Sequence, residues 1–134
     1  MDDYGHHPTE IRETLAAART VWPGRLIVVF QPHRYTRTRA LFEEFTGAFP
    51  DADLLVITDI YAASEAPIAG IHSENLAAAI RAHRQREVFY VPDFEAITEK
   101  LLSLARPGDV IITQGAGTVW KIGEDYLKKA AAKG

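Results

Sequence analysis

Four short apolar runs, each followed by a segment of helical periodicity, constrain the fold of this chain more than any other feature. Uninterrupted apolar runs of strand length are typical of β-strands buried on both faces. Strands that alternate with helices favour a mostly parallel sheet with helices on both of its faces. Over residues 1–134 the sequence therefore predicts a single α/β domain, a three-layer Rossmann-like fold. The four runs are Leu26–Phe30, Leu54–Ile57, Val88–Val91 and Val110–Thr113.

Proline and short polar residues mark where the helices begin. Pro8 fits the first turn of a helix, because proline lacks the N–H that this turn leaves unpaired. Thr36 or Thr38, Ser73 and Asp93 are predicted to cap the next three helices, since a side-chain oxygen can accept a bond from an unpaired backbone N–H. The predicted buried faces recur at helical spacing: Ile11, Leu15, Ala18 and Trp22; Leu41, Phe42, Phe45 and Phe49; Leu76, Ala77 and Ile80; Phe94, Ile97, Leu101 and Leu104.

The composition excludes several classes of function. The content of 47% hydrophobic and 25% charged residues is ordinary for one globular domain with a substantial core. A formal net charge of -3 without a long basic run argues against nucleic acid as a partner, because that binding depends on neutralising phosphates. The absence of cysteine excludes disulfides and thiolate metal sites. No signal peptide or membrane-spanning run is visible, so a cytoplasmic protein without membrane contact is expected.

The stretch Gln31–Thr38 follows the first apolar run directly and carries the most distinctive chemistry. It contains Arg34 and Arg37, three residues apart. Arginine presents a fixed fork of donors that matches a carboxylate or phosphate, and ligands of open α/β sheets bind beyond the carboxyl ends of the strands. The pair is therefore interpreted as an anion clamp, with Gln31 in the same site. The alternative is a solvated pair at the start of the next helix.

Two further loops are expected at the same rim of the sheet. In Gln114–Thr118, Gly115 and Gly117 would let backbone N–H groups approach an anion at the start of the last helix. A tight turn that needs only glycine dihedrals explains this segment equally well. The longer loop after the second run carries Asp59 and Glu65, and either carboxylate could bind an ammonium group. The alternative is that both are loop carboxylates in water, which is the favoured interpretation for Glu65.

Five histidines in a cysteine-free chain raise the question of a metal site. None of them shows the spacing of metal ligands on a helix, so no metal site is predicted. His6 and His7 precede a helix and could hydrogen-bond a substrate carboxylate. Together with Tyr4 they extend the candidate anion site of the arginine stretch. His72 and His83 are interpreted as surface or capping residues.

The features that the sequence lacks limit the chemistry it could perform alone. No Gly-x-x-x-x-Gly-Lys-Ser/Thr phosphate loop occurs in it, and no candidate nucleophile has an evident activating base. The candidate residues are therefore predicted to form only part of an active site.

Three long motifs resemble those of a known family. They are Asp-Asp-Tyr-Gly-His-His-Pro-Thr-Glu-Ile from residue 2, Phe-Gln-Pro-His-Arg-Tyr-Thr-Arg-Thr from residue 30, and Asp-Ile-Tyr-Ala-Ala-Ser-Glu-Ala-Pro-Ile from residue 59. In this order, and over essentially the whole chain, they resemble the C-terminal domain of the Mur ligases, in the branch that joins L-alanine to UDP-N-acetylmuramate. The N-terminal UDP-sugar domain and the central ATPase domain of that family are expected to be absent from residues 1–134.

The resemblance implies details of the fold and an activity. A short antiparallel strand would lie near residues 2–4, and the last strand would lie beside the first long one, bringing Gln31–Arg37 next to Gln114–Thr118. The full bacterial enzyme would transfer the γ-phosphate of ATP to the muramoyl carboxylate, and the amine of L-alanine would attack the acyl-phosphate, in peptidoglycan precursor synthesis. ATP and Mg²⁺ would be held mainly by the central domain. The isolated chain is therefore expected to be inactive.

Residue roles follow from the same resemblance. Asp3 would face the ribose of ATP. For Tyr4 and His33 the alternative is packing that shapes the motif without touching a ligand. The residues that would hold the alanine carboxylate or line its site are Arg34, Arg37, Tyr4, His6 and His33.

Two alternative functions stay open at this point. One is the related ligase that re-attaches a recycled tripeptide to UDP-N-acetylmuramate, whose first motif has Phe-Ala where this chain has Tyr4-Gly5. The other, from a different class, is a free-standing nucleotide- or anion-binding α/β module. A phosphate loop encoded upstream of Asp2 would favour a ligase, and its absence would favour the module.

Overall fold

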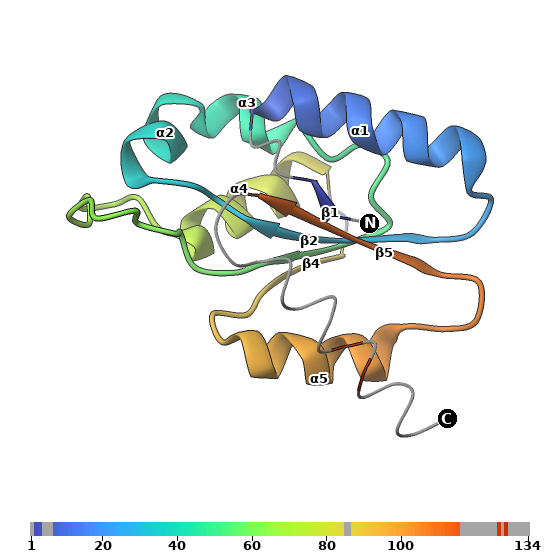
Figure 1. The fold of residues 1–134 in the computed structure, drawn as a ribbon. Coiled ribbons are helices and arrows are strands. Elements are labelled where there is room, and N and C mark those ends of the chain that lie inside the picture. The colour runs from blue at the N-terminus through green and yellow to red at the C-terminus, as the bar shows by residue number, and fades with distance from the viewer. Residues whose placement is uncertain (1, 4–6, 85–86, 116–125, 127, 129–134) are drawn as a thin grey trace.

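The computed structural model describes residues 2–3, 7–84, 87–115, 126 and 128. Strands and helices alternate along the chain as predicted, and they form a layered α/β structure (Figure 1). In chain order the elements are β1 (Asp2–Asp3), α1 (Pro8–Val21), β2 (Leu26–Gln31), α2 (Tyr35–Ala40), α3 (Phe42–Thr46), β3 (Leu54–Ile57), α4 (Ser73–Arg84), β4 (Glu87–Tyr90), α5 (Phe94–Leu104) and β5 (Val110–Gly115).

The described strands form one sheet with the order β1-β5-β2-β3-β4. The chain continues from β2 to β3 and β4 on one side, whereas β5 returns to the other side of β2. This confirms the expected position of the last strand beside the first long one. The strand order reverses between β2 and β5, and ligands of open α/β sheets bind at such a switch point, beyond the carboxyl ends of the strands.

The expected antiparallel strand near the N-terminus is wrong. β1 pairs with β5 in parallel, with Asp2 opposite Thr113 and Asp3 opposite Gln114. The physical reason is the connection: the chain leaves β1, crosses the sheet through α1 and enters β2 of the same sheet. A helical crossover of this kind joins parallel strands.

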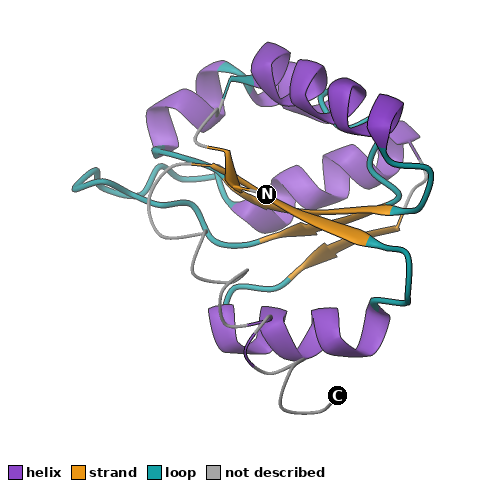
Figure 2. Cartoon of the chain, turned by 45° about the vertical axis from the view of Figure 1, so that its right-hand side comes forward, coloured by secondary structure: helices purple, strands orange, loops and turns teal. Residues whose placement is uncertain are grey.

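Helices cover both faces of the sheet, as predicted (Figure 2). The side chains of β2 alternate between the two faces. Leu26, Val28 and Phe30 pack with residues of α1, α3 and α4, whereas Ile27 and Val29 pack with residues of α5. All five are fully buried. This explains why the sequence of the strand is an unbroken apolar run rather than an alternation of apolar and polar residues.

The predicted helix starts are partly confirmed. Asp93 caps α5 by accepting a bond from the backbone N–H of Ala96 (3.1 Å). Ser73 does not cap α4, because its hydroxyl is buried and donates to the carbonyl of Thr58 (2.6 Å). His72 takes the capping role instead, with Nδ1 accepting from the N–H of Glu74 (3.1 Å).

The helix after β2 starts earlier than predicted and is divided. Thr36 and Thr38 do not cap it: they lie inside α2, and Arg34 occupies the N-cap without a side-chain cap bond. Leu41 has non-helical dihedral angles (φ -111°, ψ 16°) and separates α2 from α3. Its N–H still donates to Arg37, and its carbonyl accepts from Phe45, so hydrogen bonding continues across the junction.

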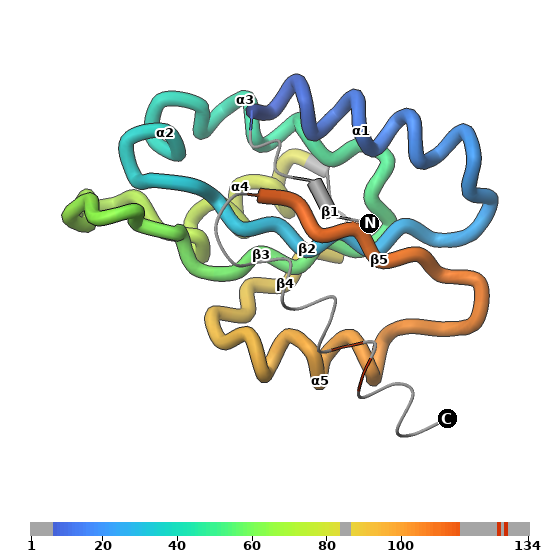
Figure 3. The backbone as a smooth tube through the Cα atoms, viewed as in Figure 1, coloured from blue at the N-terminus to red at the C-terminus, as the bar shows by residue number. Residues whose placement is uncertain are grey.

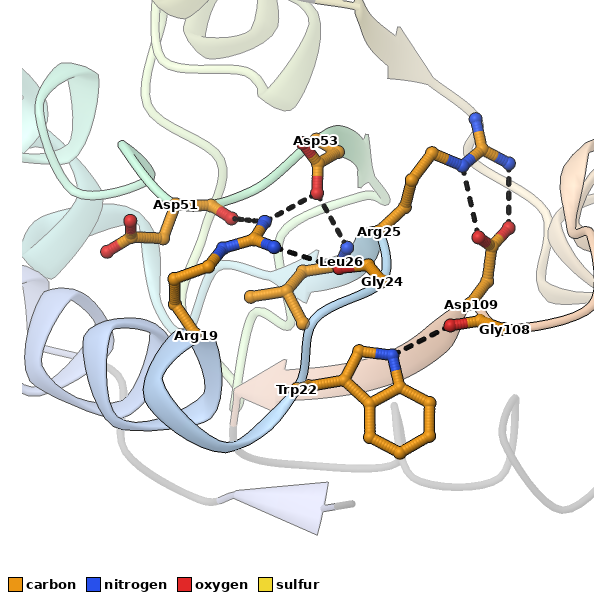
Figure 4. A network of polar contacts seen from close by, with 9 residues as sticks. All are labelled: Arg19, Trp22, Gly24, Arg25, Leu26, Asp51, Asp53, Gly108 and Asp109. Atoms are coloured by element: carbon orange, nitrogen blue, oxygen red, sulfur yellow. Dashed lines mark hydrogen bonds and ion pairs between the residues drawn. The ribbon is translucent and has the colours of Figure 1, made fainter.

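Charged side chains at the amino-terminal rim of the sheet bind one another (Figure 4). Asp53 Oδ2 accepts from the backbone N–H of Leu26 (2.7 Å) and from Arg19 Nη2 (2.5 Å). The guanidinium of Arg25 donates to both carboxylate oxygens of Asp109 (3.1 and 2.7 Å). Arg19 and Arg25 therefore hold the start of β2 against the loops that precede β3 and β5.

The Asp109 carboxylate provides a test of this network. Its side chain is 6% exposed, and the hydrogen bond from Arg25 holds its pKa below the usual range. Asp109→Asn is expected to lower the free energy of unfolding at neutral pH by roughly 1.5 to 3 kcal/mol, the range for hydrogen bonds to charged groups. Because the folded pKa is depressed, this contribution is present above the unfolded pKa of about 3.9 and is lost as the pH falls through the folded pKa.

Urea unfolding of the wild type and of Asp109→Asn at pH 7 and across the acid range measures this difference. The difference in the free energy of unfolding between the two proteins should become smaller below about pH 4. Asp51→Asn is the matched control, because the Asp51 carboxylate points away from the network in Figure 4. A gap that stays constant down to the acid transition would contradict the assigned ion pair.

Candidate functional site

The carboxyl ends of β1, β5 and β2 lie side by side and gather several of the predicted site residues. Gln31 is the register partner of Gly115, and Asp3 is the register partner of Gln114. Figure 3 shows that the path from β2 to α2 and the long loop after β3 extend from the same end of the sheet. The predicted neighbourhood of the arginine stretch and the glycine turn is therefore confirmed up to Gly115.

Gly115 is required by the backbone. Its φ is +131°, a value that residues with a side chain rarely adopt. A Cβ built at this position would lie 2.5 Å from the carbonyl oxygen of Gln31. The close approach of β5 to β2 at the rim thus depends on glycine, which supports the conformational interpretation of this turn. Gly117 lies outside the described residues, and anion binding by the turn stays a prediction.

Arg34 combines an exposed side chain with a strained backbone. It has φ 68° and ψ 141°, although it is not glycine. Its N–H donates to the carbonyl of Tyr61 (2.8 Å), and its own carbonyl accepts from the backbone N–H of Thr38 (3.1 Å) and from the Thr38 hydroxyl (2.8 Å). Such a conformation costs on the order of 1 to 3 kcal/mol, persists only where neighbours enforce it, and is found mostly at functional sites.

Arg37 follows in the first turn of α2 and is half-buried. Within the described residues, neither Arg34 nor Arg37 forms a side-chain hydrogen bond or ion pair. This differs from Arg19 and Arg25 at the other rim, whose guanidinium groups are bound to aspartates. Among the described residues, nothing occupies the donors of these two guanidinium groups beside the switch point, and such donors suit an anion.

His33 and Gln31 are held by neighbouring loops. His33 bridges to Tyr61, and their rings stack at 5.7 Å with 12° between the planes, so the packing alternative raised for His33 has direct support. Gln31 is 6% exposed and donates weakly to the carbonyl of Asp59 (3.4 Å). Its Oε1 has no hydrogen-bond partner among the residues that the structure describes. An unpaired buried acceptor is uncommon in proteins and supports a binding role for Gln31.

The structure describes only some of the N-terminal candidates. His7 is exposed and forms the N-cap of α1, where Nδ1 accepts from the N–H of Thr9 (3.2 Å). The side chain of His7 therefore has a structural role, as the cap of α1, that was not predicted from the sequence. Tyr4 and His6 lie outside the described residues, and of Asp3 only the backbone is described. Their predicted contacts with a ligand stay predictions.

The favoured interpretation of Glu65 as a carboxylate in water is wrong. Its Oε1 accepts from the backbone N–H of Thr36 (3.1 Å), and its Oε2 accepts from the Thr36 hydroxyl (2.6 Å). The hydroxyl bond is the main cause that lowers the pKa of Glu65. Because the two residues are 29 positions apart, no local sequence pattern signals this contact.

Asp59 has a specific partner as well. It accepts a hydrogen bond from the hydroxyl of Tyr90, and His72 Nε2 lies 3.8 Å from Asp59 Oδ1. Burial, followed by this hydrogen bond, raises the pKa of Tyr90. The Tyr90 hydroxyl therefore stays protonated near neutral pH and joins the ends of β3 and β4. Binding of an ammonium group by Asp59 stays a prediction.

Two further findings concern the described residues. They contain no group of three or more histidine, cysteine or acidic residues that could hold a metal ion. None of the described helices has both the length and the apolar character needed to cross a bilayer.

Comparisons with known proteins give a consistent result. Residues 1–117 match the family described as Mur ligase, glutamate ligase domain. The UDP-N-acetylmuramate--L-alanine ligase of Syntrophus aciditrophicus (strain SB) is 60% identical over 129 residues, which cover 96% of this chain and 27% of that protein. The protein of the same name from Geotalea uraniireducens (strain Rf4) is 57% identical over 129 residues, covering 96% of this chain and 28% of its own length.

A solved structure shows the same fold. The crystal structure of UDP-N-acetylmuramate-alanine ligase from Thermotoga maritima superposes with a TM-score of 0.77 and 24% identity. The match covers 98% of this chain and 26% of that one. This chain thus spans little more than a quarter of the length of the curated relatives named above.

Proposed function

This chain belongs to the Mur ligase family, and from that premise we propose that it is the C-terminal, amino-acid-binding domain of an ATP-dependent ligase that joins L-alanine to UDP-N-acetylmuramate. The names of the two relatives that are 57% and 60% identical support alanine as the amino acid. The reaction belongs to peptidoglycan precursor synthesis in the bacterial cytoplasm.

The observation that carries this proposal is the pair of guanidinium groups of Arg34 and Arg37 beside the switch point, to which no described side chain or carbonyl is bound. A planar guanidinium forms two parallel hydrogen bonds with a carboxylate, which fixes both the position and the orientation of the bound acid. The arginines would hold the carboxylate of L-alanine and leave its amino group free to react. The roles of Tyr4, His6 and His33 as lining residues belong to the same proposal.

The rest of the chemistry is assigned to other parts of the full-length enzyme. The described residues do not fit a Mg²⁺ site, and the sequence has no phosphate loop of the Gly-Lys-Ser/Thr type. ATP and Mg²⁺ would therefore be bound mainly by a central ATPase domain, with Asp3 facing the ribose. The contribution of this chain is to bind and orient the amino acid that becomes the attacking amine.

A comparison of the isolated chain with an assembled ligase tests this division of roles. We expect the purified 134-residue chain to hydrolyse no ATP and to form no amide, because it lacks groups to hold the γ-phosphate and its metal. The same chain, placed in the position of the matching segment of the Syntrophus aciditrophicus ligase, is expected to form UDP-N-acetylmuramoyl-L-alanine with release of ADP. Phosphate release and product mass measure both outcomes. ATP turnover by the isolated chain, free of contaminants, would overturn the assignment.

The choice of amino acid is tested in the same assembled enzyme. We expect kcat/KM for L-alanine to exceed that for the tripeptide L-alanyl-γ-D-glutamyl-meso-diaminopimelate, because a tripeptide needs a wider pocket. A reversed preference would identify the recycling ligase. Failure to accept either substrate, in an enzyme that is folded and binds UDP-N-acetylmuramate, would favour the anion-binding module.

A further inference from the structure

The short helix that carries Arg37 takes its N-terminal cap from a distant loop. Arg34, at the N-cap of α2, forms no side-chain cap bond, so its own segment leaves the first N–H groups of the helix without a side-chain partner. The carboxylate of Glu65 supplies one, accepting from the N–H and the hydroxyl of Thr36 at 3.1 and 2.6 Å. The negative charge also lies at the helix end where the backbone dipole favours it.

The loop that carries Glu65 also forms backbone hydrogen bonds with the segment just before α2. The N–H of Tyr61 donates to the carbonyl of Pro32, and the carbonyl of Tyr61 accepts from the N–H of Arg34, both at 2.8 Å. The rings of Tyr61 and His33 stack beside these bonds. The loop therefore contacts the chain on both sides of Arg34, through Tyr61 before it and through Glu65 after it.

These contacts are required because the local sequence does not enforce the observed conformation. A helix of six residues is too short to be stable by itself in water. The backbone of Arg34, with φ 68°, is strained and relaxes unless its neighbours hold it. Loss of the Glu65 carboxylate would release the first turn of α2 and shift Arg34 and Arg37 relative to each other.

We propose that Glu65 is a positioning residue: through Thr36 it holds Arg34 and Arg37 in the arrangement that binds the substrate carboxylate. The alanine-specific part of this inference rests on the proposed function. Each carboxylate oxygen of Glu65 accepts one bond from Thr36, so the contacts described for it are with the helix that carries Arg37. A carboxylate oxygen can accept more than one bond, and the variants below therefore distinguish positioning from direct binding of the alanine ammonium group by Glu65.

The test uses the assembled full-length ligase with Glu65→Ala, Glu65→Gln, Thr36→Val and the double variant Glu65→Ala/Thr36→Val. We expect Glu65→Ala to raise KM for L-alanine about tenfold or more, in line with the loss of hydrogen bonds to a charged group, and to leave the KM for ATP at the wild-type value. Glu65→Gln should have a smaller effect, because its amide oxygen can still accept one of the two bonds. Glu95→Gln, an exposed glutamate in the first turn of α5, is the control.

Coupling between the two partners distinguishes positioning from direct binding. If Glu65 acts through Thr36, Thr36→Val raises KM for L-alanine as well, and the double variant is no worse than Glu65→Ala alone. A wild-type KM for Thr36→Val, combined with a raised KM for Glu65→Ala, would overturn the inference in favour of direct contact with the ammonium group. A lower melting temperature with an unchanged KM for L-alanine would also overturn it, leaving only a structural role.

Hydrogen exchange of the full-length ligase provides a readout that does not depend on activity. Residues 33–40 should exchange faster in Glu65→Ala than in the wild type, whereas Glu95→Gln should leave them unchanged. Unchanged exchange at 33–40 would overturn the positioning role. If exchange increases but the wild-type enzyme does not use L-alanine, the proposed substrate fails while the positioning of the arginines stands.

Discussion

Replacing Arg34 or Arg37 by alanine in the full-length ligase is expected to raise KM for L-alanine strongly. The carboxylate of the amino acid would be left unpaired in a partly closed site, which costs roughly 2 to 5 kcal/mol. This corresponds to a factor of about 30 to several thousand in kcat/KM. Steady-state kinetics with alanine varied at saturating ATP and UDP-N-acetylmuramate measures the effect. KM for ATP should not change.

Three variants distinguish a role of these arginines in binding L-alanine from a role in protein stability. Arg37→Lys keeps the charge but loses the planar fork, so it should recover only part of the loss. Arg39→Ala removes an exposed arginine from the end of the same helix and should leave KM for alanine unchanged. Arg34→Gly removes the guanidinium but also relaxes the strained φ of 68°, so KM should rise without a loss of stability.

Two outcomes would contradict the clamp. If the alanine KM stays at the wild-type value while the ATP KM rises, the arginines hold nucleotide phosphate instead. If neither KM changes and the melting temperature falls, the pair has a structural role only.

Gly115→Ala is expected to produce the largest loss of stability. Alanine would have to adopt the φ of +131°, and its Cβ would collide with the carbonyl oxygen of Gln31 at 2.5 Å. Backbone strain and overpacking each cost on the order of 1 to 3 kcal/mol, and neither atom can move without breaking the pairing of β5 with β2. We expect the free energy of unfolding to fall by about 3 kcal/mol or more, measured by urea unfolding.

Gly70→Ala is the matched control for this substitution. Gly70 also has a positive φ, +81°, but a Cβ at this position meets nothing within 4 Å. It should therefore show the backbone strain alone, at about 1 kcal/mol. If both substitutions lowered the free energy of unfolding equally, β5 and β2 would separate at this rim without an energetic penalty. Gly115 would then not be needed for the close approach of β5 to β2.

The sequence predicted those features that follow from local periodicity. Strand β2 was recognisable because every side chain from Leu26 to Phe30 is buried, and burial on both faces leaves no polar alternation. The cap at Asp93 was predictable because a cap bond spans only three residues. The position of β5 beside β2 came from the resemblance to the Mur ligases rather than from the pattern, since periodicity does not specify strand order.

Features that depend on contacts between distant segments were missed or wrong. The expected caps Thr36 and Thr38 failed because the helix takes its cap from Glu65, on a different loop. The positive φ of Arg34 was not predictable, because arginine has no preference for that conformation and the carbonyl of Tyr61 helps to enforce it. The antiparallel direction expected for β1 came from the family resemblance and was wrong, and the two residues of this strand carry too little pattern to have corrected it.

By itself, the sequence determined the α/β class, most of the apolar faces of the described helices and the two arginines after the first long strand, because these features are encoded over a few neighbouring residues. The exception is Trp22, which was predicted on the buried face of the first helix but lies at its C-cap and is 38% exposed. Only the tertiary structure decided that β1 is parallel, that Arg34 is held in a strained conformation and that Glu65 caps the arginine helix. Each of these depends on hydrogen bonds between segments that are distant in the sequence, such as Thr36 and Glu65, which are 29 residues apart, or β1 and β5. Such bonds form only after the chain has folded back on itself, and their free energy is large enough to override the local preference of a short helix or loop.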